Sequence, residues 1–302
     1  MTPSSDSAPR APTALWLLLI ALTLTWGSNW SLFPVVLQEV SVWLFRFVSL
    51  LAGGLLLLGV ARWRGLSLRV PRSERTAVIG AALAFLAVWN VASTTAAVLI
   101  PSGQAAVLGF TMPLWVALFS ALAGRSRLTP RMGLALALGA LGVLLLAWRA
   151  LPAYAQAPLG VALGLLAGAG WAIGTLWLKR GDGVKTPPLV LTGWQMVIAS
   201  VPVALGLVLT TPDLSALAWP SPRMILIIAY ITIVPMALGN LAWFAIVGRL
   251  PAQVAGLSSI LVPVVAMVSG AIVHGEPLGP VQVAAMICCA TSMALALWKP
   301  SR

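Results

Sequence analysis

The sequence contains few charged residues. Only 8% of its 302 residues are Asp, Glu, Lys or Arg, whereas 60% are hydrophobic, and the mean hydropathy is +1.01. A water-soluble chain of this length needs a polar surface that this composition cannot supply. Apolar runs of about 20 residues recur along the chain, and helices of that length cross a hydrocarbon core of about 30 Å. The composition therefore predicts an all-α polytopic membrane protein.

Residue types with catalytic or metal-binding chemistry are equally rare. His274 is the single histidine, and the two cysteines, Cys288 and Cys289, are adjacent in an apolar run. We therefore expect no metal site, and we interpret the cysteines as small packing residues, because adjacent cysteines do not normally pair. We also expect neither a cofactor nor an enzyme, since catalysis needs a carboxylate, a histidine or an activated nucleophile beside a base.

Ten membrane spans can be placed on the apolar runs. They are 13–36, 41–61, 76–99, 104–123, 130–149, 158–178, 188–210, 222–247, 252–273 and 280–298. Residues 1–12, which are rich in Ser, Pro and Ala, are expected to form a disordered cytoplasmic tail. The connections between spans are short and contain Gly and Pro, which favour turns.

The basic residues are distributed unevenly over the connections. If the N-terminus is cytoplasmic, 15 of the 18 Lys and Arg residues fall in inward-facing segments, and only Arg149 and Arg223 face outward. This asymmetry predicts a multi-pass inner-membrane protein with both termini in the cytoplasm. The net charge of +12 then meets anionic lipid head groups at the cytoplasmic face rather than a nucleic acid.

The chain repeats itself at a distance of 150 residues. In this register Asn90 meets Asn240 and Pro113 meets Pro263, although the chain has only three asparagines. Two five-helix units, 13–149 and 158–298, are therefore expected. A unit with an odd number of spans inserts its second copy upside down, so the sequence predicts an inverted repeat. Such repeats place a substrate site near the middle of the membrane and allow alternating access.

Several residues inside the spans are candidates for binding or gating. Arg46 is the one charged residue clearly inside a span; its side chain pairs with a substrate carboxylate, makes a fixed gating contact or, as we favour, extends to the outer surface. Asn90 and Asn240 either bind substrate or, as we favour, hydrogen-bond a neighbouring helix. Pro113 and Pro263 lie in the middle of spans and are expected to kink them at equivalent depth, beside the site or only for packing.

Tryptophan is abundant, with 14 residues. Those near span ends fit an interfacial belt, whereas the deeper ones, which include Trp26, Trp171 and Trp243, either pack in the core or line a cavity for a flat or cationic ligand. Acidic residues, in contrast, are absent from the interior of the spans. A mid-membrane carboxylate is the usual device for proton coupling, so its absence favours facilitated exchange or weakly coupled export.

The sequence resembles the drug/metabolite transporter superfamily, and within it the ten-helix EamA-like family. The similarity rests on Trp26-Gly27-Ser28-Asn29, Phe45-Arg46-Phe47, the two mid-span prolines and His274-Gly275-Glu276-Pro277-Leu278. The resemblance implies a basket of helices around a central cavity. The cavity or gating candidates that it implies are Trp26, Asn29, Asn90, Pro113, Trp171, Asn240 and Pro263. The first half has no acidic residue where the second has Glu276, which therefore looks like a local structural cap.

Three functions are compatible with this sequence. The resemblance, which extends to YddG-type carriers, implies a secondary transporter that exports amino acids or similar small metabolites and works as a monomer. An alternative is a transporter of aromatic or cationic drug-like compounds that uses the deep tryptophans. A third is a membrane scaffold or lipid-handling protein that transports nothing. Water access to Asn90 and Asn240 would separate the third from the other two.

Overall fold

The computed structural model describes residues 13–100, 102–123, 129–180, 183–211, 213, 219–250, 255, 259, 261–274 and 279–297. Every regular element in these residues is a helix, and none is a strand. Seven helical segments are long and apolar enough to cross a membrane, which confirms a multi-pass membrane protein. The predicted tail at 1–12 and Glu276 lie outside the described residues, so the structure does not test them.

The first half of the chain forms five groups of helices. They are α1 (Thr13–Asn29) with η1 (Trp30–Leu32) and α2 (Phe33–Val36); α3 (Val42–Trp63); α4 (Arg72–Ala81) with η2 (Ala82–Ala87) and α5 (Val88–Leu99); α6 (Ser102–Gly109) with α7 (Met112–Leu122); and α8 (Pro130–Gln156). Four of these groups contain candidate membrane-spanning helices. The predicted fifth span at 130–149 lies within α8, which continues to Gln156.

The second half repeats this order. Its helices are α9 (Pro158–Leu178); α10 (Pro188–Thr210); α11 (Pro222–Ile231) with η4 (Thr232–Leu238) and α12 (Gly239–Arg249); α14 (Val262–His274); and α15 (Pro280–Leu297). The starts of α4 and α11, of α7 and α14, and of α8 and α15 are each 150 residues apart. Most of the residues before α14 in the predicted ninth span lie outside the described part of the chain, so the total of ten spans stays a prediction.

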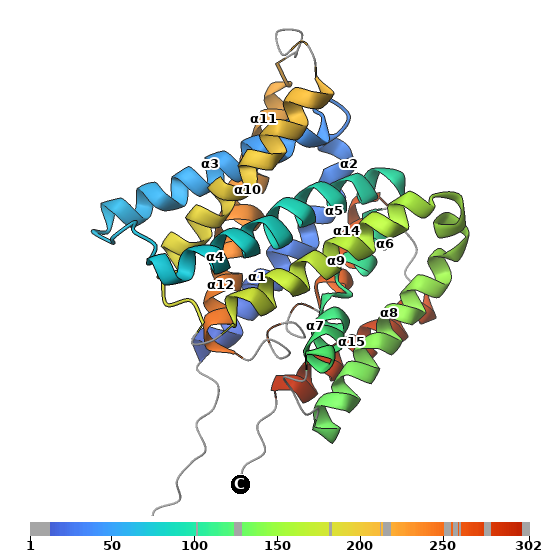
Figure 1. Ribbon diagram of the computed structural model, residues 1–302. Helices are drawn as coiled ribbons and strands as arrows, with labels where there is room; N and C mark the ends of the chain where they lie inside the picture. Colours follow the sequence, from blue (N-terminus) through green and yellow to red (C-terminus); the bar gives the residue numbers. More distant parts are fainter. Residues whose placement is uncertain are drawn as a thin grey trace, which may run out of the picture.

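Corresponding helices of the two halves pack against each other. In Figure 1, α3 lies beside α10 on one side of the molecule, and α8 lies beside α15 on the other. Glycines allow the first contact, because a Cβ atom on Gly54 would lie 2.9 Å from the carbonyl oxygen of Gly193. In the second contact, Cys289 is buried and its Sγ faces Gly142. The interpretation of this cysteine as a small packing residue is therefore confirmed.

The remaining pairs bring the halves together in the middle of the molecule. Helix α9 packs against α5, α6 and α7, and α1 packs against α12 and α14. Figure 1 shows α9 crossing the molecule, between α5 on one side and α8 on the other. Consequently α1 and α9, which begin the two halves, each turn one face toward the interior. Three tryptophans outside this interior, Trp63, Trp148 and Trp219, are strongly exposed, as expected for an interfacial belt.

Candidate functional site

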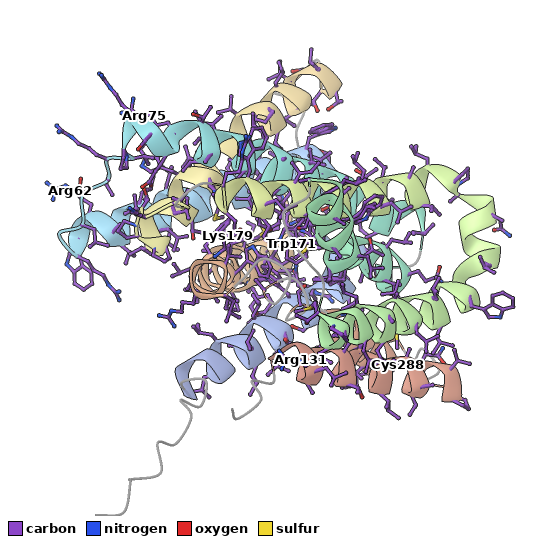
Figure 2. The ribbon with its side chains drawn as sticks, turned by 60° about the horizontal axis from the view of Figure 1, so that its bottom comes forward. Arg62, Arg75, Arg131, Trp171, Lys179 and Cys288 are labelled. Atoms are coloured by element: carbon purple, nitrogen blue, oxygen red, sulfur yellow. The ribbon has the colours of Figure 1, made fainter. Side chains whose placement is uncertain are left out.

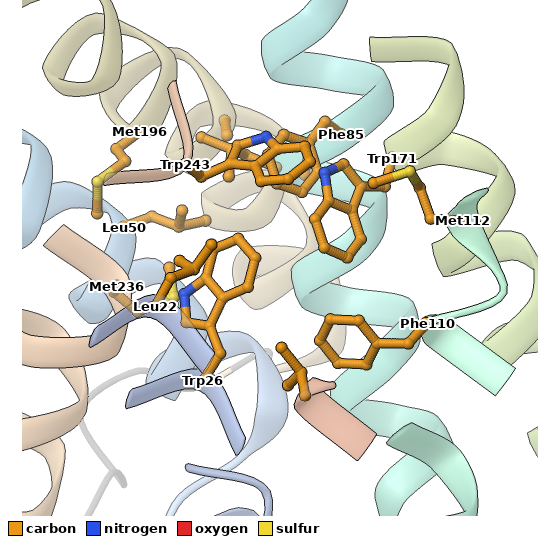
Figure 3. Packing of buried hydrophobic residues seen from close by; sticks show 14 of the residues in the cluster. Leu22, Trp26, Leu50, Phe85, Phe110, Met112, Trp171, Met196, Met236 and Trp243 are labelled. Carbon is orange, nitrogen blue, oxygen red and sulfur yellow. The ribbon is translucent and has the colours of Figure 1, made fainter. Parts of the chain in front are cut away.

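The interior of the helical basket holds a cluster of aromatic rings. Trp171 of α9 lies at its centre, completely buried, with ring centroids 5.3 Å from Trp26 of α1 and 4.9 Å from Trp243 of α12. On its other side Trp171 stacks on Phe85 of η2 at 5.3 Å and meets Trp89 of α5 edge-on at 4.8 Å. Figures 2 and 3 show Trp171 in the interior and its neighbours converging on it from different helices. The deep tryptophans thus come from both halves of the chain.

These rings enclose a small cavity. Its volume is ≈ 30 Å³, which leaves room for one or two water molecules. Six of the nine candidates from the sequence line it: Trp26, Asn29, Arg46, Asn90, Trp171 and Asn240. The conformation is therefore closed around the site, and a metabolite requires the surrounding helices to move apart.

Arg46 of α3 is buried against this cavity, with 1% of its surface exposed. Its Nε donates a hydrogen bond to Oγ1 of Thr94, and its Nη1 lies 3.8 Å from Sδ of Met236. The guanidinium carbon lies 4.3 Å from the ring centroid of Phe33 and 4.5 Å from that of Phe45. The interpretation that Arg46 extends to the outer surface is therefore wrong, because the aromatic faces and Thr94 hold it inside.

The charge of Arg46 is not balanced by a protein carboxylate. Among the described residues it forms no ion pair, and none of the six acidic residues of the chain belongs to the interior of a span. A buried guanidinium stabilised by two aromatic faces, one hydroxyl and one thioether retains unused donors. These donors make Arg46 the natural partner for an anionic group that enters the cavity.

Asn90 and Asn240 occupy matching positions just after a wide helical turn. Segments η2 and η4 both have π-helical geometry, and they begin 150 residues apart. Each asparagine donates its Nδ2 hydrogen to the carbonyl four residues earlier, Leu86 or Met236, at 2.7 Å. A π turn leaves a carbonyl without its regular backbone donor, and the amide supplies one. The preferred interpretation of these donors as bonds between helices is therefore wrong.

Several buried polar atoms beside the cavity have no hydrogen-bond partner in the described structure. They are Oδ1 of Asn29 and of Asn90 and Nε1 of Trp171 and of Trp243. A buried polar atom without a partner costs about 1–3 kcal/mol, so such atoms are rare unless they serve a ligand or water. The indole of Trp26, in contrast, donates to the carbonyl of Pro235 at 2.8 Å. The cavity lining thus combines one buried cation, two free amide oxygens and the free indole N–H of Trp171, and the N–H of Trp243 lies behind it.

The remaining sequence candidates do not line the cavity. Trp243 packs behind Trp26 and Trp171. Pro113 and Pro263 are the second residues of α7 and α14, and they do not interrupt a continuous helix. In the fourth span the break falls at Phe110 and Thr111, directly before α7. The expected kink is thus a complete interruption, and Phe110, not Pro113, reaches the cavity.

The sequence prediction missed several residues that form this site. They are Phe33, Phe85, Thr94, Phe110, Pro235 and Met236. Trp30 and Trp89 also line the cavity, and both belong to the deep tryptophans that were expected either to pack in the core or to line a cavity. Pro235 corresponds to Phe85 in the 150-residue register, so a comparison of identical residues passes over both. The π-helical segments that carry them have no sequence signature in the first half. A helical wheel centred on Asn90 places Leu86 on the same face, but it cannot indicate Phe110, which lies between α6 and α7.

Comparison with known proteins agrees with this architecture. The EamA-like transporter family matches residues 13–148 and 158–298, once in each half. The uncharacterized transporter YvbV of Bacillus subtilis is 29% identical over 95% of this chain and 92% of its own length. The uncharacterized inner membrane transporter YedA of Escherichia coli is 28% identical, over 87% of this chain and 84% of its own length.

Two further comparisons concern a shorter match and the fold. A protein of Salmonella typhimurium described as a probable amino-acid metabolite efflux pump is 33% identical over 59% of this chain and 60% of its own length. A solved crystal structure superposes with a TM-score of 0.74, covering 95% of this chain and 98% of its own, at 21% sequence identity. At this identity the likeness concerns the fold alone.

Proposed function

The chain belongs to the EamA-like transporter family, and from this membership we propose that it exports amino acids or similar small metabolites by alternating access. In this proposal 13–149 and 158–298 are two inverted five-helix repeats, and the substrate binds between them at the aromatic cavity. A single chain then contains both halves of the transport pathway and works as a monomer. The printed description of the Salmonella relative as a probable amino-acid metabolite efflux pump supports the substrate class.

The observation that carries this proposal is that the cavity contains both unused cationic donors and unused hydrogen-bond acceptors. Arg46 offers unused cationic donors, and Oδ1 of Asn29 and of Asn90 offer unused acceptors on the same cavity. A zwitterionic amino acid satisfies both, with its carboxylate on the guanidinium and its ammonium on the amide oxygens. The indoles of Trp26 and Trp171 add faces for an apolar side chain or for the ammonium.

Counterflow of labelled amino acids in proteoliposomes tests this proposal. We expect exchange by the wild type, a loss on the order of 100-fold in Arg46→Gln and partial retention in Arg46→Lys, because a charge-assisted contact contributes about 1.5–3 kcal/mol. Arg223→Gln is the matched control, since Arg223 is exposed at the start of α11. Absence of exchange with every amino acid, in protein that is monodisperse and folded, rules out this substrate class.

The aromatic cluster favours a second candidate, a carrier of aromatic or cationic compounds. Phenylalanine, phenylalaninamide and phenethylamine share a ring and an ammonium but differ at the carboxylate. The amino-acid proposal expects Arg46→Gln to reduce phenylalanine exchange alone, and expects phenethylamine to be a poor substrate of the wild type. The second candidate instead predicts that the protein exchanges all three compounds. Trp171→Ala should then reduce the exchange of all three equally, and Arg46→Gln should not reduce it.

A further inference from the structure

A second, larger groove lies away from the aromatic cavity, at the C-terminal end of α3. It has a volume of ≈ 940 Å³ and lies between the 64–71 segment, α4 and α10. Three arginines line it: Arg62, Arg69 and Arg75. Its apolar lining comes from Leu66, Leu68, Val70, Val78, Ile79 and Ile198. Figure 2 shows Arg62 and Arg75 together at one edge of the molecule, far from Trp171.

The backbone of this segment is held in place. Gly65 has a φ of 74°, the left-handed conformation that ends a helix, and its N–H donates to the carbonyl of Arg62 at 3.0 Å. Farther on, Nε1 of Trp194 in α10 donates to the carbonyl of Leu68 at 2.8 Å. Arg62 and Arg69 therefore extend from a fixed loop over an apolar floor.

The positive charge of the groove is free to meet a ligand. The guanidinium groups of Arg62 and Arg69 make no hydrogen bond or ion pair with the described residues, and Nε of Arg75 donates only to the carbonyl of Val70. The nearby carboxylate of Glu74 instead accepts hydrogen bonds from the backbone of Lys185 and Thr186. The groove thus pairs unneutralised guanidinium groups with apolar side chains.

The equivalent elements of the repeat form a corresponding groove. This groove shows that the repeat explains the shape of the arginine-lined groove but not its charge. It lies along the N-terminal two thirds of α3, against α11, and has a volume of ≈ 870 Å³. Counted from the helix starts, Trp194 and Ile198 correspond to Val48 and Ala52, and Arg75, Val78 and Ile79 correspond to Ile225, Ile228 and Ala229. The duplication therefore accounts for both grooves, but only the first one has arginines.

We propose that the arginine-lined groove is a binding site for one anionic diacyl phospholipid, with its phosphate on Arg62 and Arg69 and its acyl chains along Ile79 and Ile198. A groove of this size accommodates a head group, a glycerol backbone and the first methylene groups. Five arginines between 62 and 75 place it at the membrane face that attracts anionic lipid. The site is separate from the transport cavity and does not depend on the proposed substrate.

Native mass spectrometry of the full-length protein in detergent tests this proposal. Phosphatidylglycerol and phosphatidylcholine with identical acyl chains are titrated against the wild type, Arg62→Gln/Arg69→Gln and Arg64→Gln/Arg72→Gln. The second pair is the matched control, because Arg64 and Arg72 are exposed on the same segment but do not line the groove. Both double variants lose two charges, so a difference between them reports the site and not the net charge.

We expect one phosphatidylglycerol to bind in preference to phosphatidylcholine. In Arg62→Gln/Arg69→Gln the ratio of phosphatidylglycerol to phosphatidylcholine affinity should fall by a factor on the order of 25. Each basic residue near an anionic membrane surface contributes about fivefold to binding. The control variant should keep the preference, and glycerol phosphate without acyl chains should not compete. Equal losses in the two double variants would mean diffuse attraction and overturn the site, as would effective competition by glycerol phosphate. Size-exclusion chromatography and thermal unfolding of both variants show separately whether the protein is folded.

Discussion

At the scale of single residues, the site depends on side chains whose chemistry the surrounding protein leaves incomplete. Arg46 has no carboxylate partner among the described residues, and Oδ1 of Asn90 has no donor. The sequence could identify both positions, because an intramembrane arginine and a repeated asparagine are unusual. It could not give the direction of their side chains, since that depends on whether Phe33 and Phe45 cover the arginine.

A single glycine sets the position of one indole in this site. A Cβ atom on Gly239 of α12 would lie 2.4 Å from Nε1 of Trp26, so the indole fits only because residue 239 has no side chain. We expect Gly239→Ala to displace Trp26 from the carbonyl of Pro235 and to lower the free energy of unfolding by about 1–3 kcal/mol.

Thermal unfolding in detergent measures this effect, and Gly248→Ala is the control in the same helix. A Cβ atom on Gly248 meets nothing within 4 Å, so alanine should leave stability unchanged or raise it by about 0.5–1 kcal/mol through its better helix propensity. Equal effects of the two substitutions would show that the contact with Trp26 is unimportant.

At the scale of helices, two carboxylate contacts join the halves at different ends of the molecule. Glu39, just before α3, accepts hydrogen bonds from the backbone N–H of Ser221 at 2.8 Å and from its hydroxyl at 2.9 Å. Glu74, in the first turn of α4, accepts hydrogen bonds from the N–H of Thr186 at 3.1 Å and from its hydroxyl at 2.6 Å. The first contact joins the segment before α3 to the start of α11. The second joins the segment before α10 to the start of α4.

These contacts could not be predicted from the repeated sequence. Both carboxylates belong to the first half, but one lies in the segment before α3 and the other in α4, so the acceptor occupies a different structural position in each contact. The matching geometry becomes visible only when the helices are assembled. The starts of α4, α7 and α8, in contrast, follow the 150-residue register that the prolines and asparagines revealed, because helix starts are determined locally.

We expect the two contacts to restrain opening at different ends of the transport pathway. Glu39→Gln and Glu74→Gln each remove charge-assisted hydrogen bonds worth about 1 kcal/mol in this exposed setting, which corresponds to a change of about fivefold. The rate at which an impermeant thiol reagent labels Asn240→Cys, in protein with Cys288 and Cys289 replaced by alanine, measures the opening. One variant should speed labelling only in right-side-out vesicles and the other only in inverted vesicles.

The control for this experiment is Thr210→Val. The hydroxyl of Thr210 donates only to carbonyls of its own helix, such as that of Gly206 at 2.8 Å, so its loss should change neither rate. Faster labelling from the same side in both glutamate variants would show that the contacts stabilise the fold and do not restrain separate openings.

At the scale of the whole molecule, the cavity is too small for a metabolite, so the proposed transport through it requires the surrounding helices to move apart. The closed cavity of ≈ 30 Å³ draws on helices from both halves, and α3 packs on α10 through glycines. The sequence predicted an all-helical membrane protein from its apolar runs, and the structure confirms it. The position of the cavity lay beyond prediction, because it depends on how Trp26, Trp171 and Trp243 meet in space.

The proposed inverted arrangement of the halves predicts that equivalent residues face opposite sides of the membrane. Ser73 of α4 and Arg223 of α11 are exposed and occupy the same position in the 150-residue register. The excess of basic residues around Ser73 predicts that it faces the cytoplasm. In protein without other cysteines, we therefore expect an impermeant thiol reagent applied to intact cells to label Arg223→Cys and not Ser73→Cys, with both labelled after permeabilisation. Only an odd number of spans between residues 73 and 223 places them on opposite sides of the membrane. Labelling of both cysteines in intact cells, or of neither, would therefore mean that the two halves have the same orientation.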